Sequence, residues 1–171
     1  MTALDDFMTQ IRADYAGREP TRAELQAIGR ALQILCATFP FDATLHRVAQ
    51  PGESLMAELN VDPRGGPSLY LVSDGEGVDT VPHHHQTWAV ILGIRGEEFN
   101  VFHTPTGDGQ GRVVTSGEAR VGPGDVLVME AHEIHAIDSR RGVHPTYHVH
   151  LYGRALASLP SFASRCHEAA G

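Results

Sequence analysis

The stretch PHHHQTWAVILGIRG, residues 82–96, places three consecutive histidines ahead of the only tryptophan of the chain. Its second half is apolar and β-favouring, which predicts a strand. Because successive side chains of a strand point to opposite faces, His83 and His85 share one face and His84 points the other way. Such an H-x-H pair can offer two imidazoles to one metal ion. Because the triplet is internal and short, it is not an expression tag.

Length and composition set the broad class. The chain has 171 residues, which suits one domain, with residues 1–42 predicted as a helical segment packing on a β-barrel of residues 43–171. The net charge of −8 argues against a nucleic-acid partner. The apolar runs are too short for a membrane span, and the N-terminus lacks the features of a signal peptide, so we expect a cytoplasmic protein without a membrane partner.

The first forty residues predict two helices. Apolar residues from Leu4 to Tyr15 recur with helical spacing. A second helix begins at Thr21, which forms a capping-box pattern with Glu24, and ends before Pro40. Short β-favouring segments alternate with turns thereafter, which predicts an antiparallel barrel or sandwich. The predicted strands are 44–49, 54–61, 68–73, 87–94, 97–104, 111–115, 118–121, 125–130, 134–138 and 146–153.

The spacing around the histidines resembles the cupin superfamily. Gly77 and Gly96 flank the H-x-H pair as in the first cupin motif, G-x5-H-x-H-x-x-x-E-x6-G, but Ala89 occupies the carboxylate position. A degenerate second motif in EAHEIHAIDS, residues 130–139, places its histidine at His135. This resemblance implies a mainly β fold, the cupin double-stranded β-helix barrel, here with N-terminal α-helices. The implied metal ligands are His83, His85 and His135.

Three imidazoles suit iron, zinc, nickel and copper alike. A trio of neutral ligands leaves the site more positive than two histidines with a carboxylate would. Such a site favours an anionic co-ligand, for example a thiolate or an enolate.

Three segments together resemble the cysteine dioxygenase-type thiol dioxygenases: PHHHQTWAVILGIRGEEFNVFH (82–103), PGDVLVMEAHEIHAI (123–137) and YHVHLYG (147–153). The resemblance implies an Fe(II) enzyme that uses O2 to oxidise a small thiol, such as cysteine or mercaptopropionate, to a sulfinic acid. It implies catalytic, outer-sphere roles for His150 and Tyr152. His148 replaces the family's serine, and with His132 and Trp88 it is predicted to line the substrate pocket.

The chain also departs from that family. Val90 replaces the cysteine that crosslinks to the tyrosine in some members. The arginines that bind the substrate carboxylate are missing near residues 57–59 and near Ser161. Candidate substitutes are Arg47, Arg64, Arg95 and Arg154.

Two further hypotheses remain open. The trio can serve a three-histidine cupin of another reaction type: a diketone-cleaving dioxygenase, or a lyase or isomerase acting on a small organic acid or aromatic. It can also belong to a non-catalytic metal-binding cupin. In either case zinc or nickel can replace iron in the purified protein, and we expect a homodimer.

Overall fold

Two capped helices open the chain. The computed structural model describes residues 2–45 and 47–170, and it places α1 at Ala3–Tyr15 and α2 at Arg22–Cys36. Each helix begins with a capping box, formed by Thr2 and by Thr21, in which the side chain of the cap residue satisfies a free backbone N–H. The helical prediction is therefore confirmed, including the start of α2.

In the described residues seven strands follow in one sheet, six of them in one continuous hydrogen-bonded path. In spatial order they are β1–β2–β6–β3–β4–β7, and β5 pairs with the free side of β3. All pairs are antiparallel except β4 with β7. The bounds are Ser54–Asn60 for β1, Ser68–Asp74 for β2, Ala89–Pro105 for β3, Arg112–Val121 for β4, Val126–Met129 for β5, Ile134–Tyr152 for β6 and Glu168–Ala169 for β7. Short 3-10 helices lie at Phe41–Thr44, Leu156–Ser158 and Phe162–Arg165.

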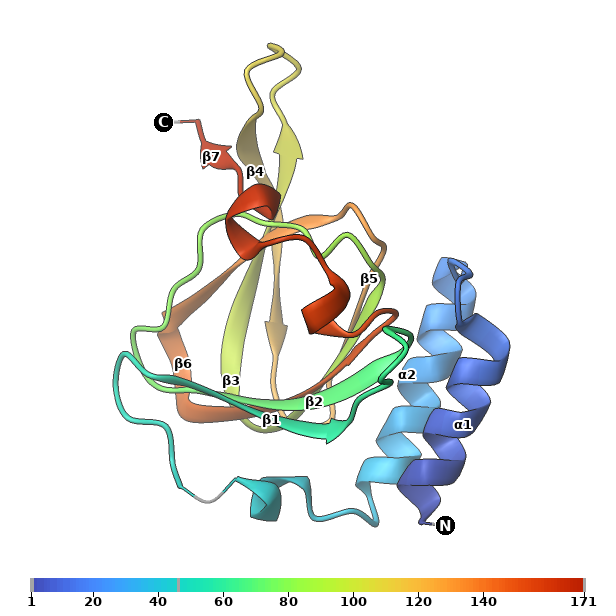
Figure 1. Cartoon of the computed structure of the whole chain (residues 1–171). Helices are drawn as coiled ribbons and strands as arrows, with labels where there is room; N and C mark the ends of the chain where they lie inside the picture. Colours follow the sequence, from blue (N-terminus) through green and yellow to red (C-terminus); the bar gives the residue numbers. More distant parts are fainter. Residues whose placement is uncertain (1, 46, 171) are drawn as a thin grey trace.

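The two longest strands, β3 and β6, lie side by side in the middle of the sheet, which curves into a half-open barrel (Figure 1). They pair along most of their lengths, but the register shifts three times between Gly93 and Phe99. Such bulges bend a strand, and β3 accordingly pairs with β5 before the bend and with β4 after it. The architecture is mainly β, as predicted: a double-stranded β-helix that remains half open, with two N-terminal helices.

Several strand boundaries differ from the prediction. Three pairs of predicted strands are single strands: 87–94 with 97–104 in β3, 111–115 with 118–121 in β4, and 134–138 with 146–153 in β6. Turn-type residues between them form bulges instead of loops. The strand predicted over 44–49 is wrong, because Thr44 ends a 3-10 helix and residues 47–49 form no strand, while His46 lies outside the described residues.

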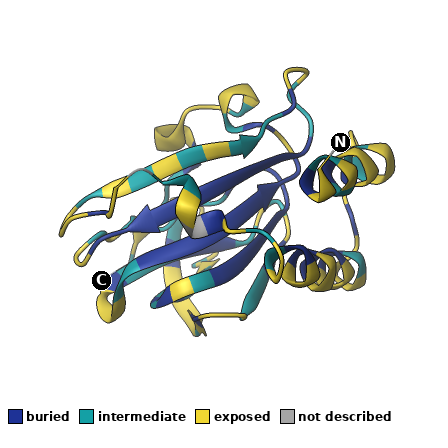
Figure 2. Ribbon diagram, turned by 90° about the horizontal axis from the view of Figure 1, so that it is seen from below, coloured by how far each residue is buried: buried dark blue, intermediate teal, exposed yellow. Residues whose placement is uncertain are grey.

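The sheet near the helices is buried on both faces. Alternate residues of β2, β3 and β6 pack with the helices, among them Leu71, Val90 and Leu151. The residues between them, including Tyr70, Ile91 and Tyr152, pack inside the barrel. Figure 2 shows these strands buried along most of their length, whereas each helix is buried along one side only. No helix of the described ranges is both long and apolar enough to cross a membrane.

Trp88 belongs to the helix-facing core. Its ring lies 6.1 Å from that of Tyr15 on α1 in an edge-on arrangement, and it is almost fully buried. It packs in the cluster with Leu25 and Leu32 of α2, whereas Tyr152, next to the histidines, packs in the separate cluster inside the barrel. This placement differs from the prediction that Trp88 lines the substrate pocket, because its side chain lies in the cluster that packs with the helices.

A substitution at Gly93 tests whether close packing against Gly122 determines where β3 bends. A Cβ added there would lie 2.1 Å from the backbone oxygen of Gly122, which cannot move without breaking the turn that it belongs to. We expect Gly93→Ala to destabilise the fold by about 1–3 kcal/mol, the usual cost of overpacking. Urea unfolding measures this cost.

The matched control is Gly117→Ala on β4, where an added Cβ meets nothing within 4 Å. Its free energy of unfolding should stay the same or rise slightly, since alanine restricts the unfolded chain. Equal stabilities for the two variants would contradict the packing account of the bend.

Candidate metal centre

The segment that carries the histidine triplet is extended but belongs to no regular strand. One residue pair fixes it to β6: the N–H of His83 donates to the carbonyl of His135 over 2.8 Å, and the N–H of His135 donates back over 2.9 Å. On its other side, the N–H of His84 donates to the carbonyl of Arg165, and that of His167 donates to Pro82. The segment is thus held between β6 and the C-terminal residues.

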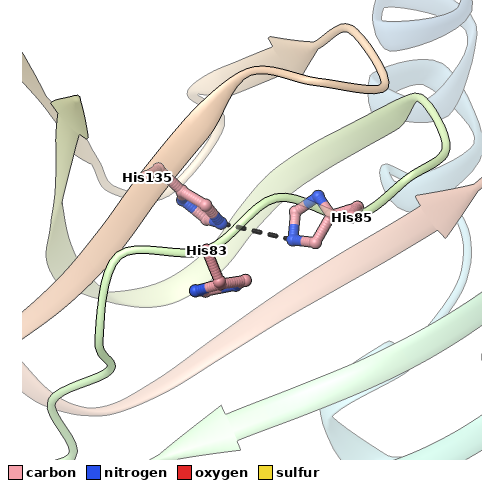
Figure 3. Close-up of side chains that lie close together, drawn as sticks. All are labelled: His83, His85 and His135. Atoms are coloured by element: carbon pink, nitrogen blue, oxygen red, sulfur yellow. Dashed lines mark hydrogen bonds between the residues drawn. The ribbon is translucent and has the colours of Figure 1, made fainter. Parts of the chain in front are cut away.

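This clamp brings the three histidines together. His83, His85 and His135 are all buried, and one ring nitrogen from each lies within 4.8 Å of those of the others. The ring centroids are 4.6 to 5.3 Å apart. Figure 3 shows the three rings converging, with Nε2 of His85 and Nε2 of His135 3.2 Å apart. The cluster has the donor set and spacing of a site for one metal ion.

Outer contacts fix the orientation of two of these rings. Nδ1–H of His83 donates to the carbonyl of Val81 over 2.9 Å. Nδ1–H of His135 donates to Oδ1 of Asn100 over 2.8 Å. A neutral imidazole that donates through Nδ1 keeps its lone pair on Nε2, and metal-binding histidines commonly make such contacts. The ring nitrogens that face inward are therefore free to bind an ion.

Burial keeps the trio neutral. Loss of water lowers the pKa of His83, and it lowers the pKa values of His85 and His135 far below the ordinary value. The neighbouring histidines lower the pKa of each ring further. Neutral imidazole is the form that binds metals, so the site fits a cation without a change of protonation.

His150 and Tyr152 lie on the same inward face of β6, beside the trio. Nδ1 of His150 is 2.9 Å from the Tyr152 hydroxyl, and the Tyr152 ring centroid is 5.1 Å from that of His85. Burial, followed by the charge of His148, lowers the pKa of His150 to about 4. Burial raises the pKa of Tyr152. At neutral pH the pair therefore consists of a neutral imidazole and a protonated phenol.

His148 faces a carboxylate that the sequence analysis missed. Nδ1 of His148 lies 3.1 Å from Oε1 of Glu98, and both side chains are 1% exposed. The Asn100 amide also donates to Oε1 of Glu98, over 3.2 Å. Glu98 and Asn100 are two residues apart in EEFNVF, so the alternation of strand side chains was the available signal that both face inward.

A buried arginine was also missed. Arg165, in the 3-10 helix Phe162–Arg165, is 8% exposed and makes no ion pair with the described residues. Its guanidinium donates to the carbonyls of Pro160 and His84. Its charge contributes to lowering the pKa of His83, and the ring of Phe162 from the same turn lies 4.8 Å from that of His83. The only indication in the sequence was that Arg165 lies near Ser161, where the thiol dioxygenase resemblance places an arginine that this chain lacks.

The four arginines that the sequence offered as substitutes are exposed. Each contacts a neighbouring group: Arg47 pairs with Glu53, Arg64 with Asp62, Arg95 lies over the Tyr147 ring, and Arg154 donates to the Ser158 carbonyl.

His132, which the sequence also assigned to the substrate pocket, lies outside the trio. His132 is exposed, and its ring centroid is 5.9 Å from that of His84. His84 itself points away from His83 and His85, as alternation predicts, and lies 5.3 Å from the ring of His167. These three histidines form a separate outer cluster.

Comparison with known proteins gives only distant structural similarities. No protein-family model matches the chain, and no curated protein matches it. A cupin superfamily protein from Desulfitobacterium hafniense is 19% identical, over 61% of this chain and 80% of its own, with a TM-score of 0.47. A protein with a double-stranded β-helix domain from Klebsiella pneumoniae is 15% identical, over 67% and 87%, with a TM-score of 0.49.

The DMSP lyase DddQ from Ruegeria pomeroyi is 17% identical to this chain, over 66% of this chain and 52% of its own, with a TM-score of 0.49. Similarities at this level carry no conclusion about the reaction of this chain. The chemistry of this chain therefore has to be inferred from its own residues.

Proposed function

We propose that the protein is a mononuclear iron enzyme that oxidises a small thiol to a sulfinic acid with O2. The observation that carries the proposal is the buried trio of neutral imidazoles, two of them with Nε2 left free by outer contacts, next to the His150–Tyr152 pair. In the overall reaction both oxygen atoms pass to sulfur. The thiol gives up four electrons and O2 accepts four, so no further reductant is needed.

The ligand set favours a thiolate. Bound Fe(II) would supply redox chemistry and sites for sulfur and dioxygen. Because His83, His85 and His135 contribute no charge, an ion among them keeps its full positive charge and attracts an anionic ligand. The barrel wall around the trio excludes water, which strengthens this attraction.

Tyr152 and His150 orient the reacting groups. The phenol keeps its proton because burial raises its pKa. It can donate that proton in a hydrogen bond toward the substrate side while accepting one from Nδ1–H of His150. His150 therefore fixes the direction of the phenolic hydrogen and is a positioning residue.

Arg165 supports an acidic substrate. A buried guanidinium whose partners are two carbonyls and the Phe162 ring is costly, and an anion offsets that cost best. The C-terminal turn holds this cation near His83 and His84. We infer that the thiol substrate carries a carboxylate or a similar anionic group.

Oxygen consumption tests the reaction. The iron-loaded protein should consume O2 when cysteine or mercaptopropionate is added, with a sulfinic acid as product. Tyr152→Phe should lower the rate about 10–100-fold, the usual effect of losing an outer contact of a metal site, while the iron content stays unchanged because the phenol is not a ligand. Oxygen electrode traces and metal analysis give both quantities.

An absence of thiol-dependent uptake with every thiol tested would contradict the proposal. Uptake with a 1,3-diketone instead would favour the diketone-cleaving reaction. Unchanged turnover in Tyr152→Phe would remove the proposed role of that residue.

Arg165→Gln tests the substrate class. For mercaptopropionate, kcat/KM should fall on the order of 100-fold, which corresponds to the loss of a buried charged contact. For mercaptoethanol, which has no carboxylate, it should change little. Steady-state kinetics with both thiols measure whether the loss depends on the substrate carboxylate. Arg154→Gln, at an exposed arginine, is the matched control. Equal losses for the two thiols would show that Arg165 acts on the fold instead.

A further inference from the structure

A hydrogen-bonded chain leads from the trio into the barrel. Nδ1–H of His135 donates to Oδ1 of Asn100 over 2.8 Å, and Nδ2–H of Asn100 donates to Oε1 of Glu98 over 3.2 Å. His148 meets the same oxygen of Glu98 through Nδ1, at 3.1 Å. The His135 imidazole is therefore two hydrogen bonds away from a carboxylate.

Glu98 is buried with only one of its two carboxylate oxygens paired. The side chain is 1% exposed, and Oε2 has no hydrogen-bond partner in the described part of the chain. Burial tends to raise the pKa of Glu98, but the charge of His148 and its hydrogen bond outweigh that effect and lower the pKa. Glu98 is thus an ionised carboxylate in the interior, with half of its acceptor capacity unused. The contact with His148 offsets part of the cost of burying this charge, and the unpaired Oε2 leaves the rest uncompensated.

The trio lacks a carboxylate of its own. Ala89 occupies the position where the cupin motif carries one, and the described group of potential ligands consists of three histidines. A dication bound there would have no charged ligand from the protein, while an ionised carboxylate lies further along the chain of hydrogen bonds that begins at His135.

We propose that Glu98 is a positioning residue that tunes the metal centre: it acts through Asn100 on His135 and supplies, from outside the ligand shell, the negative charge that the ligands lack. The inference rests on the proposed metal function. Glu98 polarises the Asn100 amide, so Oδ1 accepts more strongly from Nδ1–H of His135. The Nε2 lone pair of His135 then becomes a better donor to a metal. His148 holds the carboxylate in place.

A purely structural role makes a different prediction. If Glu98 and His148 only tie β3 to β6, their loss lowers stability and leaves metal affinity unchanged. If Glu98 acts on His135, affinity changes even in a variant that folds normally. Metal affinity therefore separates the two roles without reference to any reaction.

The test is a titration of the metal-free protein with Co2+, followed by the absorption bands of the bound ion, with Zn2+ competition for the dissociation constant. Glu98→Gln keeps the size of the side chain and removes its charge, so the dissociation constant should rise about 10-fold and the Co2+ bands should shift. Asn100→Ser cuts the chain at its middle and should weaken binding similarly, even if Glu98→Gln does not fold. Glu97→Gln, next to Glu98 but ion-paired with Arg120 at the surface, should bind like the wild type.

Glu98→Gln and Asn100→Ser should also fail to add in the double variant, because they interrupt one chain. Wild-type affinity and spectrum in folded Glu98→Gln or folded Asn100→Ser would overturn the inference and leave the metal function standing. A wild-type protein that binds no Co2+ would overturn both.

Discussion

The site depends on one reciprocal pair of backbone hydrogen bonds. His83 and His135 exchange N–H to carbonyl contacts of 2.8 and 2.9 Å, and residues paired in this way project their side chains to the same face of the sheet. The triplet segment has no regular strand of its own, so this pair sets its register against β6. A slip by one residue would bring His84 inward and turn His83 out.

Burial then gives the cluster its chemistry. Water exclusion keeps the three imidazoles neutral, and Val81 and Asn100 direct the lone pairs of His83 and His135 inward. The same low-dielectric interior makes the charged groups around the trio effective over longer distances. Glu98 lies on the barrel side of the trio, whereas Arg165 lies on the C-terminal turn. The arrangement separates a negative group, linked to His135 through Asn100, from a positive group that donates to the carbonyl of His84.

The sequence predicted the elements that follow simple periodicities. Helical spacing and capping boxes located both helices, and strand alternation separated His84 from His83 and His85. The cupin spacing selected His135 over His132, and only His135 is in the buried cluster.

Other features depend on tertiary contacts that a single sequence does not carry. Bulges occur at glycines and charged residues where loops were predicted, and Trp88 packs against Tyr15 of α1. Glu98 was missed because its partner, His148, is fifty residues away in the sequence. Arg165 was missed because its position depends on how the C-terminal turn packs over His83.

Metal binding tests the central claim most directly. The metal-free protein and three single variants, His83→Ala, His135→Ala and His132→Ala, can be titrated anaerobically with Fe(II) and the bound ion measured after desalting. The wild type and His132→Ala should each retain a single ion per chain, because His132 belongs to the outer cluster. His83→Ala and His135→Ala should lose nearly all of it. Retention of the ion by folded His135→Ala, or its loss from His132→Ala, would contradict a centre built from the buried trio.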